Sequence, residues 1–174
     1  MVHEKALTEV FLEKDKKIMK INIPASLDFS WMLRDFIGST IQSDTKFSQK
    51  WKHRLQLMAD ELINNAIEHW SAPWDPINIC LVLYNNSDIE IIVEDIWTWK
   101  SVYKSDDLLA KAMLNREIMT ADPTANRTIR WRWLAMIVLN WSDEFHYEDN
   151  DRWWLTAKIL KKYSPDCADV PVNN

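Results

Sequence analysis

The feature of this 174-residue chain that most constrains its fold is a single glycine beside 11 tryptophans. Glycine makes up about 7% of an average protein, which predicts roughly 12 glycines in a chain of this length. A fold with many turns needs glycine wherever a backbone φ angle is positive or two groups approach closely. One glycine cannot serve the turns of an ordinary α/β fold. Either the chain is nearly all helical, or tryptophan stands where glycine is expected.

Short runs of alternating or β-branched apolar residues argue against the all-helical alternative, because such runs predict strands. The predicted strands are Val10–Leu12, Ile18–Ile23, Ile77–Tyr84, Ile89–Glu94, Phe145–Tyr147 and Leu155–Leu160. Apolar residues at helical spacing predict four helices. The first helix follows the N-cap residue Ser26, and the second spans Phe47–His69. The third spans Leu108–Ile118, and the fourth begins over Leu134–Leu139. The polar stretch Thr120–Arg130 between the last two is a loop long enough to be functional.

The order of these elements is β-β-α-α-β-β-α-loop-α-β-β. It predicts an α+β fold, a two-layer sandwich in which helices cover one face of a mixed or antiparallel sheet. Residues 1–163 are expected to form one domain, followed by a polar, flexible tail over residues 164–174. Because this fold contains many turns, its architecture does not explain the shortage of glycine.

Charge and cysteine content exclude several classes of function. The chain has 21 basic and 26 acidic side chains, a formal charge of −5, which argues against nucleic-acid binding. Cys80 and Cys167 are too few for a disulfide framework, which suits a reducing cytoplasm. No signal peptide begins the sequence, and no apolar stretch approaches the roughly 20 residues of a membrane span. We therefore expect a cytoplasmic protein without a membrane partner.

One candidate site lies late in the second predicted helix, in the sequence Glu-Leu-Ile-Asn-Asn-Ala-Ile-Glu-His. Glu61, Asn65 and His69 follow one another at intervals of four residues and so share one helix face. The Glu61 carboxylate can accept a proton, and the Asn65 carboxamide offers the hard oxygen that Mg²⁺ prefers. The alternative is a solvated polar face opposite a buried apolar stripe.

Two further stretches carry candidate chemistry. Asp95 leaves the end of a predicted strand, where it can accept a hydrogen bond from a ligand amine or act as an ordinary turn residue. Further along, Arg130-Trp131-Arg132-Trp133 leads a loop into an apolar helix. With glycine at the two tryptophan positions, this loop would present backbone N–H groups and a helix N-terminus to a phosphate.

In this order the three stretches read E-x-x-x-N-A-I-x-H, then D-x-W-x-W, then W-x-W-L-x-x-I. They resemble the N, G1 and G2 boxes of the GHKL (Bergerat-fold) ATPases, and particularly those of the anti-sigma-factor serine kinases. The resemblance covers about residues 8–162. The N box matches residue for residue, whereas the G boxes match except that Trp97, Trp99, Trp131 and Trp133 stand in place of the family's glycines.

The resemblance implies a histidine-kinase-like ATPase fold that binds ATP and Mg²⁺. It implies a serine/threonine kinase that phosphorylates an antagonist protein (anti-anti-sigma-like), sequesters a regulator (sigma-factor-like) and can form a homodimer. By position, Asp95 would accept the adenine amino group, Asn65 would bind Mg²⁺ and Glu61 would be the catalytic base. Residues 97, 99, 131 and 133 would line the nucleotide site and residues 120–130 its lid. Arg130 and Arg132 would either neutralise phosphate charge or be solvated loop residues.

Alternative functions follow from the same sequence. A non-catalytic module could keep this fold and act by sequestering its partner. The ATPase domain of a histidine kinase is disfavoured, because no helical dimerisation segment with a phospho-acceptor histidine precedes the N box. A metal hydrolase built on Glu61, Glu68 and His69 lacks a third ligand at proper spacing. An aromatic platform for sugars or single strands would explain exposed tryptophans, but the acidic charge disfavours nucleic acid.

Most of the remaining tryptophans also occupy turn positions typical of glycine, namely Trp70, Trp74, Trp141, Trp153 and Trp154. Trp31 and Trp51 fall inside predicted helices and are less diagnostic. One interpretation is that a stop codon that some bacterial lineages translate as glycine has been written as tryptophan. The other is that the tryptophans are genuine, at a cost of about 1–3 kcal/mol wherever φ must be positive.

Peptide mass spectrometry of the protein isolated from its native cell distinguishes the two interpretations. We expect glycine at positions 97, 99, 131 and 133, because the family's phosphate-binding backbone has no room for an indole there. A peptide with tryptophan at these positions would refute the recoding interpretation. In the coding DNA, one codon should be shared by all 11 tryptophan positions and absent at Gly38.

Overall fold

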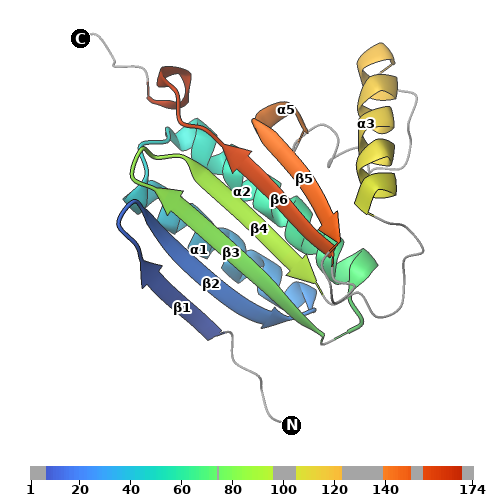
Figure 1. Cartoon of the computed structure of the whole chain (residues 1–174), viewed down its shortest axis with the longest axis horizontal. Helices are drawn as coiled ribbons and strands as arrows, with labels where there is room; N and C mark the ends of the chain where they lie inside the picture. Colours follow the sequence, from blue (N-terminus) through green and yellow to red (C-terminus); the bar gives the residue numbers. More distant parts are fainter. Residues whose placement is uncertain (1–6, 74, 96–104, 123–138, 150–154, 170–174) are drawn as a thin grey trace.

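A six-stranded antiparallel sheet forms one layer of the protein, with strand order β1-β2-β3-β4-β6-β5 (Figure 1). The computed structural model describes residues 7–73, 75–95, 105–122, 139–149 and 155–169. Its strands are β1 (Leu7–Leu12), β2 (Lys16–Pro24), β3 (Pro76–Tyr84), β4 (Ile89–Asp95), β5 (Glu144–Asp149) and β6 (Leu155–Lys161). Every neighbouring pair is antiparallel. The predicted α+β class is confirmed, and the sheet is antiparallel rather than mixed.

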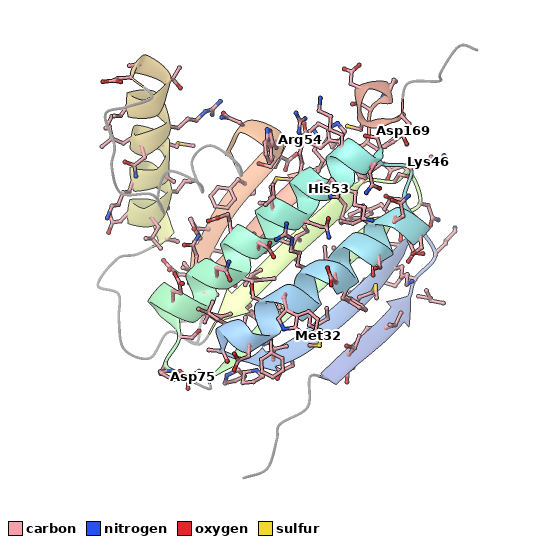
Figure 2. The ribbon with its side chains drawn as sticks, turned by 180° about the vertical axis from the view of Figure 1, so that it is seen from behind. Met32, Lys46, His53, Arg54, Asp75 and Asp169 are labelled. Atoms are coloured by element: carbon pink, nitrogen blue, oxygen red, sulfur yellow. The ribbon has the colours of Figure 1, made fainter. Side chains whose placement is uncertain are left out.

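Helices α1 and α2 lie side by side across one face of this sheet (Figure 2). The helices are α1 (Ser30–Asp44), α2 (Gln49–Asn65), α3 (Ser105–Ala121) and the single turn α5 (Leu139–Trp141), with 3₁₀ turns at Leu27–Phe29 and Pro165–Cys167. A wider π turn, Ala66–Trp70, extends α2. Helix α3 instead packs beside the edge strand β5. Within the described ranges, no helix is long and apolar enough to cross a membrane.

The core lies between the sheet and these two helices, because alternate strand residues point into that layer. Its fully buried side chains include Ile23, Ile77, Ile79, Leu81 and Ile89 from the strands and Leu33, Ile37, Ile41, Leu55, Met58 and Leu62 from the helices. Burying each such side chain contributes about 1.5–3 kcal/mol. This layer is therefore the main source of stability in the described part of the chain.

Helix boundaries differ from those predicted, for local reasons. Ser48 caps α2, since its hydroxyl accepts a hydrogen bond from the Trp51 N–H at 3.4 Å, while Phe47 is buried in the core. The loop predicted to begin at Thr120 does not begin there, because Thr120 and Ala121 are the last two residues of α3. The Thr120 hydroxyl donates to the Arg116 carbonyl at 2.8 Å, which satisfies an acceptor in the last turns of that helix.

Two tryptophans hold the N-terminal end of α2 against the last part of the chain. The Arg54 guanidinium lies 4.7 Å from the centre of the Trp51 ring and 5.1 Å from that of Trp141, and so contacts both indoles. The Trp51 indole N–H also donates to the Asp166 carbonyl at 3.2 Å, and the Ser48 N–H donates to the Cys167 carbonyl at 2.7 Å. Residues 165–167, within the segment predicted to be a tail, thus pack on α2.

Backbone angles do not require glycine at the tryptophans that the structure describes. In the described ranges only Ser87, in the turn between β3 and β4, has a positive φ, of 73°. Trp31, Trp51, Trp70 and Trp141 therefore all have ordinary φ angles. Trp70 and Trp141, expected at turn positions typical of glycine, do not have the positive φ that favours glycine.

Gly38, the sole glycine, lies where α1 approaches α2 most closely. A Cβ atom at this position would lie 2.0 Å from the Gln56 Nε2 atom and 2.5 Å from its Cδ atom. Gln56 is held there because its Nε2 donates to the Arg34 carbonyl at 2.9 Å and its Oε1 lies 3.1 Å from the His53 Nδ1. The side chain of Gln56 thus crosses α1 in the space that glycine leaves.

We expect the effect of Gly38→Ala on the free energy of unfolding to change sign with the residue at position 56. In the wild type it should be destabilising, because displacing Gln56 breaks hydrogen bonds worth about 1 kcal/mol each. In a Gln56→Ala background it should stabilise by up to about 1 kcal/mol, since alanine is the better helix former. Urea unfolding of the four proteins measures this coupling. Equal stabilisation in both backgrounds would show that Gln56 does not explain the glycine.

Candidate functional site

Asp95 interrupts the apolar pattern of β4. Ile89, Ile91 and Val93 alternate into the helical layer, and Asp95 occupies the next inward position with only 1% of its surface exposed. A strand buried on this face calls for an apolar residue here. An unpaired carboxylate in such a place costs free energy, so its presence points to a role other than packing.

The two carboxylate oxygens of Asp95 differ in their surroundings. Oδ1 accepts a hydrogen bond from the Leu155 N–H at 3.2 Å, which ties the end of β4 to the start of β6. Oδ2 is buried and has no hydrogen-bond partner in the described part of the chain. Burial raises the pKa of Asp95 to about 7, although the hydrogen bond from Leu155 opposes this shift. Asp95 thus keeps one acceptor unused in a dry position.

Asn65 ends the regular part of α2 with an unused donor. Its side chain is half-buried, and its Nδ2 group has no hydrogen-bond partner among the described residues. The π turn that follows, Ala66–Trp70, packs against β4. Such turns widen a helix and are frequent at functional sites. The hydroxyl of Ser71, just after this turn, is likewise buried without a partner.

These polar groups belong to one end of the molecule, where α2 and β4 end and β6 begins (Figure 1). Tyr147 on β5 belongs to the same region, because burial and then the nearby Asp95 carboxylate raise the pKa of its hydroxyl. Sequence reasoning missed Ser71 and Tyr147. The alternation of the sequence indicates Tyr147, because this residue lies two positions after Phe145 and so places a hydroxyl among the inward-facing residues of β5.

Glu61 lies one turn before Asn65 on α2, and its side chain is half-buried. The two residues therefore share a helix face, as their spacing predicted. The backbone of His69 continues in the π turn. The remaining predicted site residues, Trp97, Trp99, Arg130, Trp131, Arg132 and Trp133, lie outside the described residues.

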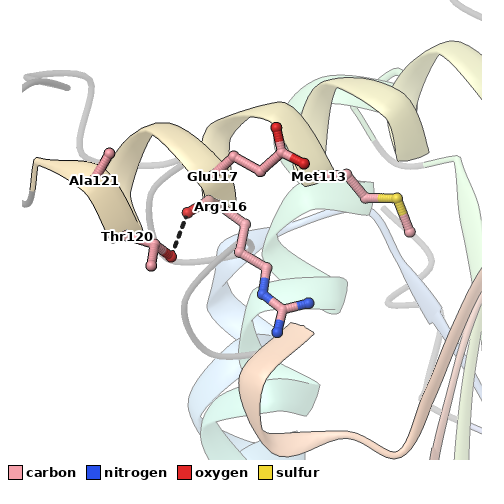
Figure 3. Close-up of a pocket in the computed structure, with 5 residues that line it drawn as sticks. All are labelled: Met113, Arg116, Glu117, Thr120 and Ala121. Carbon is pink, nitrogen blue, oxygen red and sulfur yellow. Dashed lines mark hydrogen bonds between the residues drawn. The ribbon is translucent and has the colours of Figure 1, made fainter.

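Two surface hollows lie away from Asp95. One, of about 500 Å³, follows α3 and is lined by Met113, Arg116, Glu117, Thr120 and Ala121 (Figure 3). The other, of about 450 Å³, lies between α1 and α2 and includes Arg34, Asp60 and Asn64. Glu61, Asn65 and Asp95 line neither hollow. The buried polar groups near Asp95, rather than the larger hollow, therefore identify the candidate site.

A metal bound by protein side chains alone is not supported in the described ranges, which contain no group of three or more histidine, cysteine or acidic residues suited to it. Mg²⁺ is commonly held by one or two protein ligands together with substrate phosphates. Asn65 fits that arrangement: its oxygen can bind the ion, and its unpartnered Nδ2 can donate to an anionic oxygen.

Comparison with known proteins adds no assignment, since no model of a protein family and no curated protein sequence matches the chain.

The raised pKa of Asp95 predicts how the free energy of unfolding changes with pH. Since its carboxyl group holds a proton more tightly in the folded state than in the unfolded state, wild-type stability should fall as pH rises towards 8. Relative to Asp95→Asn, which retains an acceptor for Leu155, the wild type should lose about 2–3 kcal/mol between pH 5 and pH 8. Urea unfolding of both proteins across this pH range measures the difference in their stability. Asp60, whose pKa is also raised, is present in both proteins, so its contribution cancels in that difference. A constant difference would show that Asp95 titrates normally.

Proposed function

We propose that the chain is an ATP-binding serine/threonine protein kinase of the GHKL type, similar to the anti-sigma-factor kinases. It would phosphorylate an antagonist protein and sequester a regulator in the cytoplasm. The observation that carries the proposal is the inward-facing Asp95, whose Oδ2 atom is buried and unpartnered. A buried acceptor at a strand end is suited to a ligand that brings its own N–H donor, such as the adenine amino group.

Asp95 is held in position for this role by its other oxygen. The hydrogen bond from Leu155 fixes the carboxylate between β4 and β6, so that little ordering is needed when a ligand binds. In its ionised form the carboxylate is satisfied at Oδ2 only by a ligand with a donor, whereas a carbonyl at the same place would leave two acceptors facing each other. This arrangement favours adenine over bases that carry an oxygen at the corresponding position.

Asn65 and Glu61 supply the remaining functions of the proposal. Bound Mg-ATP would provide the transferable phosphoryl group and the charge that neutralises it. Asn65 would hold the ion through its side-chain oxygen. Glu61, one helical turn away, would accept the proton of the attacking serine hydroxyl, as a general base does in phosphoryl transfer. Arg130 and Arg132 are proposed to neutralise phosphate charge.

The absence of a family match is compatible with the proposal. Two of the three motifs on which the resemblance depends are defined by glycines, and this chain has tryptophan at all four of those positions. The N box and Asp95 carry the chemistry of the proposed site and are unaltered. The resemblance thus fails at the positions that shape the backbone and holds at the positions that make polar contacts.

A second candidate is a non-catalytic module that keeps the fold and binds a protein partner. The tryptophans at 97, 99, 131 and 133 favour it if they are genuine, because bulky indoles would crowd the place of the nucleotide. In that case nucleotide binding should be weak or absent, whereas partner binding should remain.

Calorimetric titration with Mg-ATP and Mg-ITP tests the proposed kinase. ITP carries a carbonyl oxygen where ATP carries the amino group, so the wild type should prefer ATP. We expect Asp95→Asn to weaken ATP binding at least tenfold, since a hydrogen bond to a charged group is worth about 1.5–3 kcal/mol, and to improve the relative binding of ITP. Asp60→Asn is the matched control, because Asp60 is another partly buried aspartate whose pKa burial raises, to about 6.

The same titration separates binding from catalysis. Asn65→Ala should abolish Mg-dependent binding of ATP. Glu61→Ala should bind ATP normally and lose phosphotransfer to an antagonist protein. If the wild type binds no nucleotide, the non-catalytic module is the better description. Unchanged phosphotransfer by Glu61→Ala would refute the role of Glu61 as base.

A further inference from the structure

We propose that the hollow between α1 and α2, of about 450 Å³, binds a primary ammonium group carried on a short apolar stem. A free alkylamine presents such a group, and so does the lysine side chain of a peptide. The hollow lies on the helical side of the molecule (Figure 2), and its volume suits a small ligand. Its α2 residues form a different row from that of Glu61 and Asn65, so the site does not depend on the nucleotide site proposed above.

Two rows of side chains line the hollow. Asp60, Asn64 and Glu68 follow one another at intervals of four residues through the end of α2 and the π turn, and so share one face. The other row, at the start of α1 and in the 3₁₀ turn before it, consists of Leu27, Ser30, Trp31 and Arg34. The Ser30 hydroxyl donates to the Asn64 Oδ1 atom at 2.8 Å and so joins the two rows. Both walls thus belong to the packed helix pair, which fixes their separation.

Asp60 is a carboxylate held deep in this hollow with incomplete compensation. Its side chain is 14% exposed, and its Oδ1 atom is buried without a hydrogen-bond partner among the described residues. Oδ2 lies 3.4 Å from the Nε atom of Arg34, a long contact to a side chain that is itself 50% exposed. Burial raises the pKa of Asp60 to about 6, although the Arg34 charge opposes this shift. Because the carboxyl torsion is soft, either oxygen can turn towards a cation with better-placed donors, which would displace Arg34.

The charges and oxygens of the hollow favour a cation that donates hydrogen bonds. Two carboxylates, those of Asp60 and Glu68, stand against one guanidinium, and Asp35 on α1 adds a further negative charge that acts on Asp60. The oxygens of Ser30 and Asn64 keep lone pairs after their mutual hydrogen bond. A primary ammonium offers three donors and no acceptor, which matches this group of acceptors. A metal held by side chains alone fits less well, because the described ranges contain no group of three acidic or histidine ligands suited to it.

Apolar side chains at the rim of the hollow suit the stem of such a ligand. Leu27 is 51% exposed and Trp31 is 68% exposed, and both line the hollow. Methylene groups that pack on these side chains are removed from water, and the face of an indole also attracts a cation. The polar contacts proposed for the ammonium group do not involve Trp31. The site is therefore retained if position 31 is glycine, and only a contact with the stem is lost.

Titration of the ¹⁵N-labelled full chain with butylamine, followed by NMR at neutral pH and constant ionic strength, tests the site. We expect the amide signals of residues 30–34 and 60–68 to shift and to saturate at millimolar butylamine, as suits a small probe. Asp60→Asn should weaken this binding at least about tenfold, because a hydrogen bond between charged groups is lost. Asp44→Asn is the matched control and should bind as the wild type does, since Asp44 lies at the other end of α1 and pairs with Lys17 at 2.6 Å.

Arg34→Gln distinguishes a cation site from an anion site. Removing the guanidinium leaves Asp60 without its competing cation, so butylamine should bind about two- to fivefold more tightly. Inorganic phosphate, which a site built around Arg34 would bind, should leave the signals of the hollow unchanged in the wild type. Tighter binding of phosphate than of butylamine, or weaker binding of butylamine by Arg34→Gln, would overturn the assignment. Well-dispersed NMR spectra confirm that each variant is folded.

Further probes identify the source of the ammonium group. N-acetyl-lysine amide carries the same head and stem on a peptide backbone, so tighter binding than that of butylamine indicates a lysine side chain, and weaker binding indicates a free alkylamine. Butanol and tetramethylammonium lack the ammonium donors and should not produce the saturable shifts. Equal binding of either one, unchanged butylamine binding by Asp60→Asn, or no saturable shift in the wild type at millimolar butylamine would overturn the proposal. Because Asp60→Asn is also the control of the nucleotide titration, its loss of amine binding with unchanged ATP binding would separate the two sites.

Discussion

Burial of one face of the antiparallel sheet beneath α1 and α2 is the constraint on which the described structure depends. Each helix contributes one apolar stripe, and the strands contribute every second residue. The two helices approach so closely that the Gln56 side chain fills the space left by Gly38 and bonds to the backbone of α1. Position, tilt and spacing of the helices are thus set by packing, and the candidate site is built at one end of that packed layer.

The candidate site places unpartnered polar atoms in the same buried layer whose apolar side chains stabilise the fold, and these atoms lower the stability of the folded state. Asp95 extends the buried series of β4, and Asn65 and Ser71 place further unused polar atoms near the end of α2. A buried carboxylate without full compensation lowers the stability of the folded state at neutral pH. A protein can retain such groups when a ligand satisfies them, since binding energy then offsets the cost. These polar atoms also lie at or just beyond the ends of β4 and α2.

Sequence periodicity predicted most of the fold because period-2 and period-3.6 patterns report directly on burial. The order of strands and helices followed from residues such as Ile77–Tyr84 and the stripe of α2. Strand pairing order, in which β6 lies between β4 and β5, did not follow, because it depends on contacts between distant segments. Asp95 and Asn65 were predicted from motif spacing, but no pattern indicated that Asp95 would use one oxygen for Leu155. That contact spans 60 positions of the chain and exists only once β4 and β6 pair.

The tryptophans are not equivalent, and position 51 bears most directly on their interpretation. If one codon was recoded, all 11 positions are glycine, including those inside helices. Trp31 is 68% exposed, so glycine there would lose little beyond about 0.5 kcal/mol of helix propensity. Trp51 differs, because it stacks on Arg54, lies 4.5 Å from the Lys161 ammonium and donates to Asp166. Glycine at position 51 would remove all three contacts and leave the hydrogen bond from the Ser48 N–H to the Cys167 carbonyl to hold residues 165–167 on α2. The stability of the described part of the chain therefore depends on the residue at position 51, and recoding would cost it the contacts that Trp51 makes with Arg54, Lys161 and Asp166.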